Sequence, residues 1–309
     1  MIVVVCPGQG SQTPGFLNPW LELPSFKSSL LAMQEASGID LVKHGTVSDA
    51  DTIRDTAVAQ PLIVAAGIAT AATLFGGKSA VDFGIGGVSG HSVGEITAAA
   101  IAGIFDQAQA IKFVKVRADA MADAAAIEPT SMAAIVGGEQ VTIESRLAEL
   151  GLEPANYNGS GQIVAAGSTE GIAALQAEPV AGTRVIPLQV AGAFHTRYMA
   201  PAVATLDAYS KTIEIADPKV KLWSNNGGKL VANGASFVEL LVSQVSSPVR
   251  WDLCMSEMVA AGVTGIIEVS PAGTLAGLAK RSMPGIEIVA LKSPENLEAA
   301  RNLISSHSN

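Results

Sequence analysis

The hydrophobic positions of this chain fall into short apolar runs and helical stripes. Residues 2–6 form an unbroken, β-branched apolar run, which predicts a strand buried on both faces. A helix is predicted to begin at Pro61, because proline is favoured in the first position of a helix, and to continue through an apolar stretch to Leu74. Asp106 is a capping residue in front of an amphipathic stretch, so we expect a helix from there to about Ala126.

The pattern changes between about Pro129 and Val190, where short strands and helices alternate. The periodicity predicts strands at 132–136, 162–166 and 184–190 and helices at 141–150 and 169–177. A segment built this way is typical of a compact α+β insert.

Longer elements return after the insert. Apolar positions from Met199 to Leu206 predict a helix, and parallel-type strands are expected at 220–224, 265–269 and 287–291. The polar tail at 305–309 is expected to fray.

The order of these elements predicts an α/β protein with an open, mostly parallel sheet. Residues 1–127 and 192–309 are expected to form its core, and residues 128–191 the smaller insert. Of the 309 residues, 49% are apolar and only 15% are charged, which suits a large core.

Charge and cysteine content limit the partners and the compartment. The net charge of −9 and the lack of any Lys/Arg-rich run argue against nucleic acid as a partner. The apolar start is too short for a signal peptide, and no stretch free of polar breaks reaches membrane-spanning length. Cys6 and Cys254 form no CxxC pattern and are expected to be reduced, buried thiols. We therefore expect a cytoplasmic protein without a membrane partner.

A candidate nucleophile lies in the sequence Gly90-His91-Ser92-Val93-Gly94, between a predicted strand and a predicted helix. A sharp strand-to-helix turn exposes the serine oxygen, and small residues on either side let the backbone double back. The N-terminus of the following helix offers free N–H groups to an oxyanion. The alternative is a glycine-rich turn without a chemical role, because the five-residue pattern alone is weak evidence.

A nucleophilic serine needs a base, which is usually a histidine, and the chain has four. His91 adjoins Ser92 but would point away from it, His44 is expected in a polar loop, and His307 is in the tail. His195 remains, where the last strand of the insert returns to the core. The alternative is a histidine with a purely structural role at this junction, and elimination of the other three favours a base.

Arg117 lies on the apolar face of its predicted helix, where a charged residue is not expected. Its neighbours three and four positions away are apolar: Phe113, Val114, Ala120 and Met121. A buried guanidinium needs a partner, commonly a carboxylate. Two interpretations stay open, a structural ion pair with an internal Asp or Glu and a clamp for a substrate carboxylate beside the serine.

Further motifs follow one another along the chain. They are Pro7-Gly8-Gln9-Gly10-Ser11-Gln12, Gln60-Pro61, Glu95 after the serine motif, Asn158 with Gly161-Gln162, Phe194-His195, Pro248-Val249-Arg250-Trp251 and Glu268-Val269-Ser270-Pro271-Ala272-Gly273. Together they resemble the free-standing bacterial malonyl-CoA:acyl carrier protein transacylases of fatty acid synthesis and the acyltransferase domains of polyketide synthases. The resemblance implies a hydrolase-like α/β core with a ferredoxin-like insert.

The resemblance also implies roles for individual residues. Ser92 would be acylated and His195 would be its base, in a dyad whose imidazole is oriented by a backbone carbonyl near Arg250. The oxyanion hole would use the backbone N–H groups of Gln9 and Val93.

The acyl pocket follows from the same resemblance. Arg117 would bind the malonyl carboxylate, and Gln60, Phe194 and Asn158 would contact the substrate. Phe194 departs from many free-standing relatives, which have a small residue before the histidine, and is similar to malonyl-selective polyketide domains. Many relatives also have Gly-Pro-Gly where this chain has Ser270-Pro271-Ala272-Gly273, which puts the local turn in doubt.

The predicted function is ping-pong transfer of malonyl from malonyl-CoA to the phosphopantetheine thiol of an acyl carrier protein. We expect a monomer that needs neither metal nor organic cofactor. Two alternatives remain, an α/β-hydrolase esterase or thioesterase, whose histidine normally comes last in the chain, and a non-catalytic binding protein. An acidic carrier would need a local basic patch on this acidic chain. The candidates for it are Arg197, Arg250, Lys280 and Arg281.

Overall fold

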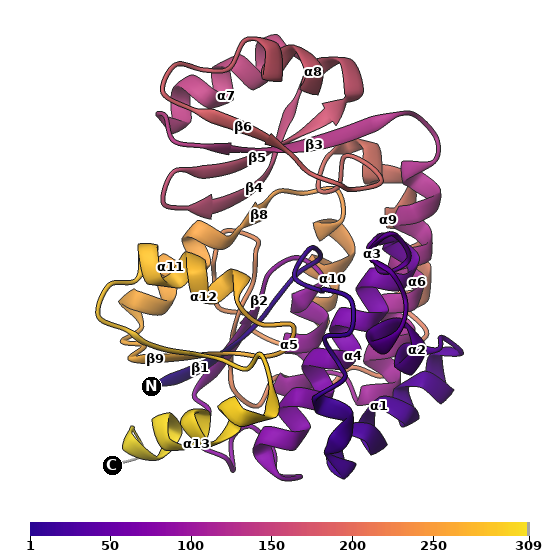
Figure 1. Ribbon diagram of the computed structural model, residues 1–309, viewed down its shortest axis with the longest axis vertical. Helices are drawn as coiled ribbons and strands as arrows, with labels where there is room; N and C mark the ends of the chain where they lie inside the picture. Colours follow the sequence, from indigo (N-terminus) through magenta and orange to yellow (C-terminus); the bar gives the residue numbers. More distant parts are fainter. Residues whose placement is uncertain (308–309) are drawn as a thin grey trace.

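The fold is built on two five-stranded sheets, one above the other in Figure 1. The computed structural model describes residues 1–307. The lower sheet contains β1 (Ile2–Cys6), β2 (Gly87–Gly90), β7 (Lys221–Trp223), β9 (Gly265–Glu268) and β10 (Glu287–Ala290). Its order is β10-β9-β1-β2-β7, and every neighbouring pair is parallel. The predicted parallel core sheet is confirmed.

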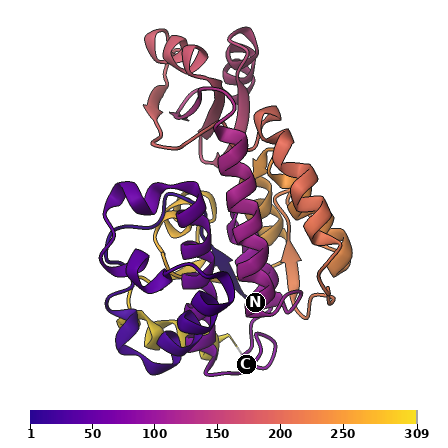
Figure 2. The ribbon, with the colours of Figure 1, turned by 90° about the vertical axis from the view of Figure 1, so that its right-hand side faces the viewer.

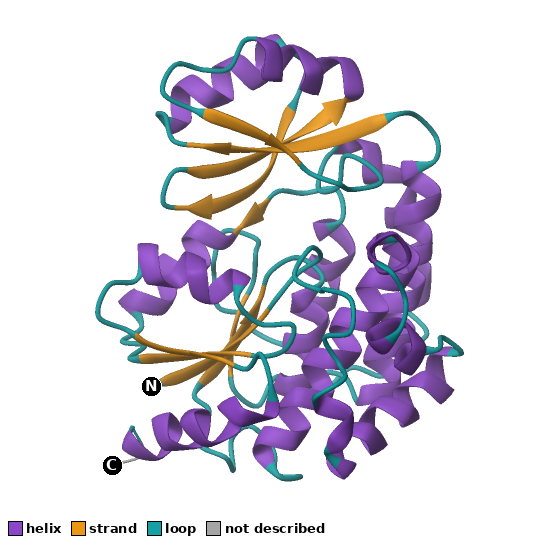
Figure 3. Ribbon diagram, in the orientation of Figure 1, coloured by secondary structure: helices purple, strands orange, loops and turns teal. Residues whose placement is uncertain are grey.

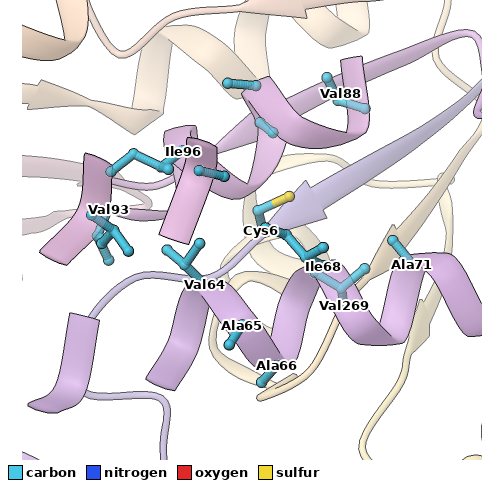
Figure 4. Packing of buried hydrophobic residues seen from close by; sticks show 14 of the residues in the cluster. Cys6, Val64, Ala65, Ala66, Ile68, Ala71, Val88, Val93, Ile96 and Val269 are labelled. Carbon is cyan, nitrogen blue, oxygen red and sulfur yellow. The ribbon is translucent and has the colours of Figure 1, made fainter. Parts of the chain in front are cut away.

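The central strand β1 is buried on both faces, as its unalternating sequence predicts. Val4 and Cys6 belong to the large core beneath the nucleophile turn, where helices pack against one face of the sheet (Figure 4). Val3 and Val5 point to the other face, where they belong to a second cluster.

Helices cover both faces of this sheet. Those of the large core are α1 (Pro24–Ser37), α2 (Leu41–Thr46), α3 (Ala50–Arg54), α4 (Thr56–Phe75), α5 (Gly94–Ala102), α6 (Gln107–Ala125), α9 (Ala200–Ser210), α10 (Gly234–Gln244) and α13 (Leu297–Ser306). The second cluster packs against α11 (Trp251–Ala260) and α12 (Thr274–Ser282). Three short 3₁₀ helices complete the connections: Trp20–Glu22, Arg197–Met199 and Pro294–Asn296.

Helix α4 begins earlier than Pro61, so that prediction is wrong. The side chain of Asp55 accepts a hydrogen bond from the N–H of Ala57 at 2.8 Å and caps the helix there, which leaves the proline inside it. Among residues 1–307, α4 is the one helix long and apolar enough to cross a membrane by length and composition, although Gln60, Thr70 and Thr73 interrupt its apolar sequence. However, 89% of its apolar window is buried inside the fold, so its apolar surface is used in the core.

The upper sheet is mixed and has the order β6-β3-β5-β4-β8. Its strands are β3 (Thr130–Val136), β4 (Glu153–Gly159), β5 (Gln162–Ser168), β6 (Arg184–Pro187) and β8 (Val249–Arg250), and its helices are α7 (Gln140–Glu149) and α8 (Thr169–Ala177). The first four strands pair antiparallel, and both helices lie on one face (Figure 3). This arrangement confirms the ferredoxin-like fold.

Strand β8 joins this sheet from a distant part of the chain and pairs with β4 in parallel. The division of the chain at residues 127 and 192 stays a prediction, although the sheet itself takes a strand from beyond it. Figure 2 shows α6 running from the helices around the lower sheet up to the upper one.

Two predictions of irregular structure were wrong. His44 lies within helix α2 and not in a loop. Helix α13 includes Ser305 and Ser306, and His307 is its C-terminal cap, so the tail is ordered that far. Residues 308–309 of the predicted frayed tail lie outside the described residues.

Candidate active site

Ser92 occupies the sharp turn between β2 and α5. Its backbone φ is +54°, in the left-handed region that few non-glycine residues adopt. A Cβ atom at Gly90 would lie 2.1 Å from the backbone of Gly94, and one at Gly94 would lie 2.1 Å from the carbonyl oxygen of Cys6. Only glycine therefore fits on either side of the serine, and the turn has the strand–turn–helix context that the motif requires.

His195 lies against the serine. Its Nε2 is 2.7 Å from the Ser92 Oγ, and its Nδ1 is 2.9 Å from the backbone carbonyl oxygen of Gln244. The carbonyl accepts a hydrogen bond only from a protonated Nδ1, which leaves Nε2 free to accept the serine proton. A backbone carbonyl was expected near Arg250, and the structure corrects its position to the C-terminal end of α10.

The imidazole of His195 is neutral at physiological pH. Burial, assisted by the nearby charge of Arg117, lowers its pKa to about 3. The other three histidines form their hydrogen bonds elsewhere. His91 Nε2 is 2.9 Å from Asn158 Oδ1, His44 Nδ1 is 3.1 Å from Ser48 Oγ, and His307 Nδ1 is 2.9 Å from the Leu303 carbonyl oxygen.

Arg117 projects from α6 into the same site and is fully buried. It donates from Nη1 to Gln60 Oε1 at 2.5 Å and from Nη2 to Gln244 Oε1 at 2.9 Å, and Nη2 is 3.4 Å from Ser92 Oγ. Among residues 1–307 it forms no ion pair, and its Nε has no hydrogen-bond partner. The direct structural ion pair that its position allowed is therefore absent from the described chain.

Burial lowers the pKa of Arg117 to about 10, and the charge of Glu95 acts in the opposite direction. The guanidinium thus keeps its charge at neutral pH without a carboxylate in contact. A buried, charged and incompletely paired arginine beside a serine is suited to receive an anion.

A small cavity of about 90 Å³ brings most of the predicted residues together. It is lined by Gln9, Gln60, His91, Ser92, Arg117, Met121, Met132, Asn156, Leu188, Val190, Phe194 and His195. Asn158 is absent from this lining and is bound to His91, whereas Asn156 of the same strand is present. Val93 is the N-cap of α5, and a helix has free N–H groups in its first turn.

A larger cavity of about 480 Å³ adjoins the first one. Both are lined by Gln9, Leu188 and Val190, and the larger one also reaches Arg54 of α3. The two cavities therefore share one wall, with the half-exposed Arg54 at the larger one and Ser92 at the smaller one.

Asn225 and Gln244 of the site were not singled out from the sequence, and Glu95 was named there only as part of a motif, without a role. Glu95 accepts hydrogen bonds from the Asn225 N–H at 2.7 Å and from Gln244 Nε2. Asn225 Oδ1 in turn accepts from the Ser92 N–H at 2.7 Å. The charge of Glu95 directly after the nucleophile motif was the signal that could have given this residue a role. Asn225 and Gln244 had no signal, because they lie more than a hundred residues away from Ser92. No group of three or more His, Cys, Asp or Glu suited to a metal occurs in the described part of the chain.

Residues 3–291 match the acyl transferase domain family. The malonyl CoA-acyl carrier protein transacylase of Mycobacterium tuberculosis (strain ATCC 25618 / H37Rv) is 46% identical over 308 residues, which are 98% of this chain and 100% of the relative. This chain belongs to the malonyl CoA-acyl carrier protein transacylase family of acyltransferases.

Solved structures agree with this assignment. The crystal structure of MCAT from Mycobacterium tuberculosis has a TM-score of 0.92 at 46% identity, over 98% of this chain and 100% of that one. A malonyl-transacylase solved in complex with a type II PKS acyl-carrier protein has a TM-score of 0.91 at 27% identity, over 98% of this chain and 99% of that one. The α/β fold that the sequence predicts is therefore the fold of this family.

Proposed function

We propose that this acyltransferase moves a malonyl group from malonyl-CoA to an acyl carrier protein through a malonyl ester on Ser92. The observation that carries the proposal is the position of the Ser92 Oγ, 2.7 Å from the Nε2 of a buried, neutral histidine and 3.4 Å from a buried guanidinium. The site thus combines a nucleophile, its base and a binding group for an acyl carboxylate. The comparisons support malonyl-CoA and a carrier protein as the two substrates.

In the first half-reaction His195 takes the Ser92 proton and the oxygen attacks the thioester carbon. The negative charge that develops on the carbonyl oxygen is stabilised by the N–H groups of Gln9 and Val93. The C–S bond then breaks, the imidazolium returns its proton to the sulfur, and coenzyme A leaves as the free thiol.

The second half-reaction repeats these steps with the carrier as nucleophile. The phosphopantetheine thiol gives its proton to His195 and attacks the malonyl ester, and Ser92 leaves as the hydroxyl after regaining the proton. The Gln244 carbonyl keeps the Nδ1–H of His195 in place through both halves. All of this chemistry uses side chains and backbone groups of the chain itself.

The malonyl carboxylate is bound by Arg117, which is already held in position by Gln60 and Gln244. Phe194 lines the same small cavity and leaves little room for a branch on the acyl group. The pantetheine arm reaches Ser92 along the adjoining cavity of about 480 Å³. Asn158 acts indirectly in this proposal, since it holds His91 beside the turn.

Two of the four basic docking candidates are already neutralised. Arg197 is paired with Glu153, and Arg250 with Asp252. Lys280 and Arg281 are exposed on α12, and neither has an ion-pair partner among residues 1–307. We propose that the carrier docks on α12 and that the enzyme acts as a monomer in the cytoplasm.

The esterase alternative has less support. Its base would be His307, which caps α13 and binds the Leu303 carbonyl. Water would replace the carrier thiol as the acceptor, and malonate would be the product.

Initial-rate kinetics test the proposed function. With malonyl-CoA and phosphopantetheinylated carrier varied together, double-reciprocal plots should give parallel lines, because coenzyme A leaves before the carrier reacts. The product should be malonyl-carrier. Intersecting lines would contradict the covalent route, and release of malonate at a rate independent of the carrier would favour the esterase.

A further inference from the structure

Glu95 is a buried carboxyl for which the proposed chemistry has no use. It lies in the first turn of α5, three residues after the nucleophile, and only 1% of its surface is exposed. A charged group in such a position costs several kcal/mol of desolvation unless its partners compensate. Its contacts show which groups compensate.

The first contact of Glu95 is with Gln244, which also contacts His195 and Arg117. Glu95 Oε2 accepts from Gln244 Nε2, and Gln244 Oε1 accepts from Arg117 Nη2 at 2.9 Å. The backbone carbonyl of Gln244 holds His195 Nδ1 at 2.9 Å. Gln244 therefore orients the imidazole with its backbone while its side chain connects the carboxylate to the guanidinium.

The second contact leads to the nucleophile turn. Glu95 Oε1 accepts from the backbone N–H of Asn225 at 2.7 Å. The Asn225 side chain accepts from the Ser92 N–H and donates to the Gly90 carbonyl, both at 2.7 Å. Asn225 thus spans the strained turn, and the carboxyl of Glu95 fixes Asn225.

The charged group that interacts most directly with Glu95 is the guanidinium of Arg117. Arg117 of α6 is the cation whose charge acts on it, and the Cys254 thiol of α11 is neutral, since burial raises its pKa to about 12. Arg250, which is paired with Asp252, and Tyr157 line a cavity of about 370 Å³ together with Glu95.

Within the described residues 1–307, Arg117 is the one charged group whose charge acts on this carboxyl. From α4 comes the neutral Gln60, and Cys6 of β1 has its pKa raised by burial. Lys221 of β7 is exposed at the far end of its strand from Asn225.

We propose that Glu95 is a positioning residue that couples the nucleophile turn, the base and the clamp, and that its ionised form takes up a proton from solvent when malonyl binds at Arg117. This inference rests on the proposed function. The malonyl carboxylate takes over as the counter-charge of Arg117, and two carboxylates cannot share one buried cation without cost. The cavity beside Glu95 lies outside the acyl pocket, so the proton does not have to pass the bound substrate.

The coupling has a definite sign. Burial raises the pKa of Glu95 to about 8 in the free enzyme, and a second negative charge raises it further. Below pH 8 the carboxyl is already protonated and binding costs nothing extra. Above pH 8 each binding event must take up a proton, so affinity for malonyl-CoA falls by up to tenfold per pH unit. His195, with a pKa of about 3, and Arg117, with a pKa of about 10, titrate outside this window.

The test measures single-turnover acylation of Ser92 by quenched mass spectrometry, at several malonyl-CoA concentrations between pH 6.5 and pH 9. The wild-type enzyme should show a half-saturating concentration that is constant up to about pH 7.5 and rises several-fold by pH 9. In Glu95→Gln it should be independent of pH. The maximal acylation rate of this variant should fall at least tenfold, because either orientation of the new amide points its NH₂ at an N–H donor.

The matched control is Glu268→Gln. Glu268 is also a fully buried carboxyl with its pKa raised by burial, but it accepts from the N–H groups of Gly273, Leu275 and Ala276 at the start of α12. This variant should keep the wild-type pH dependence even where it unfolds at a lower temperature.

Three outcomes decide the matter. A wild-type half-saturating concentration that does not change between pH 6.5 and pH 9 overturns the proton coupling. A Glu95→Gln enzyme that retains the wild-type pH dependence and rate overturns the positioning role. If the wild-type protein is not acylated at Ser92 at all, the proposed function fails first, and this result is distinguishable from the other two.

Discussion

The imidazole of His195 lies fully buried between the Ser92 hydroxyl and the Gln244 carbonyl. An unperturbed histidine is half protonated near pH 6.5, and the protonated half cannot act as a base. Burial and the positive charge of Arg117 keep this one neutral, and its position requires a backbone φ of +62°. A dyad of this kind needs no carboxylate beside the histidine, because the carbonyl fixes the tautomer.

Arg117 is predicted to determine the preference of the enzyme for malonyl over acetyl. Replacement by alanine should reduce malonyl transfer about ten- to a hundredfold, because a hydrogen bond to a charged group contributes about 1.5–3 kcal/mol. Acetyl transfer should be spared, since acetyl has no carboxylate to bind. The measurement is the ratio of kcat/KM for malonyl-CoA and acetyl-CoA in the same preparation, which cancels any loss of folded enzyme.

Arg117→Lys serves as the control for charge. Lysine keeps the cation but cannot reach Gln60 and Gln244 with the same forked geometry, so its malonyl-to-acetyl ratio should lie between those of the wild type and Arg117→Ala. An alanine variant that still prefers malonyl by the original ratio would refute the clamp.

Residue identities near Ser92 could be predicted, and their partners could not. The glycines around the serine belong to the local Gly-x-Ser-x-Gly pattern, and elimination among four histidines left His195. The carbonyl that orients it belongs to Gln244, 49 residues further along the chain, and no local pattern indicates which carbonyl will face an imidazole. Asn158 shows the same limit, because its position in a motif does not say which way its side chain points.

Among the helices, α12 is the one on which the carrier protein is predicted to dock. Carrier proteins are typically acidic, and Lys280 and Arg281 are both exposed in the last turn of this helix. Reversal of both charges, in Lys280→Glu with Arg281→Glu, should raise the half-saturating carrier concentration about tenfold at low salt. Ser92 acylation by malonyl-CoA should be unchanged. Added salt should reduce the difference, since it screens exposed charges.

A second double variant provides the control for total charge. Lys27 and Lys112 are exposed on α1 and α6, and neither forms an ion pair within residues 1–307. Their reversal to glutamate changes the net charge by the same amount and should leave the carrier requirement as it is. An equal loss in both double variants would mean that overall charge and not α12 governs carrier binding.

Elements with a strong local pattern were predicted well, and those defined by tertiary contacts were not. The insert helix Thr169–Ala177 and the strand β1 have the predicted bounds. The predicted start of α4 at Pro61 was wrong, because the capping side chain of Asp55 outweighs the preference of proline for the first turn. Strand β8 is two residues long and exists only because β4 lies beside it.

In the whole molecule, the active site lies between the part built on the lower sheet and the part built on the upper sheet. Its cavity is lined by Ser92 and Arg117 from the lower part and by Met132 and Asn156 from the upper sheet. Strand β8 and the hydrogen bond of His91 to Asn158 connect the two parts across this gap. The sequence predicts two kinds of sheet, but which faces meet depends on long-range contacts that a linear pattern does not contain.

The intact mass of the protein shows whether a malonyl ester forms on Ser92 with His195 as the base. After mixing with malonyl-CoA in the absence of a carrier, the protein should gain the mass of one malonyl group, located on the peptide that contains Ser92. Addition of phosphopantetheinylated carrier should return the enzyme to its starting mass and give malonyl-carrier. Ser92→Ala should gain no mass, His195→Ala should gain it at least a hundredfold more slowly, and His307→Ala should behave as the wild type. A malonyl group on another residue, or undiminished labelling in Ser92→Ala, would show that Ser92 is not the nucleophile.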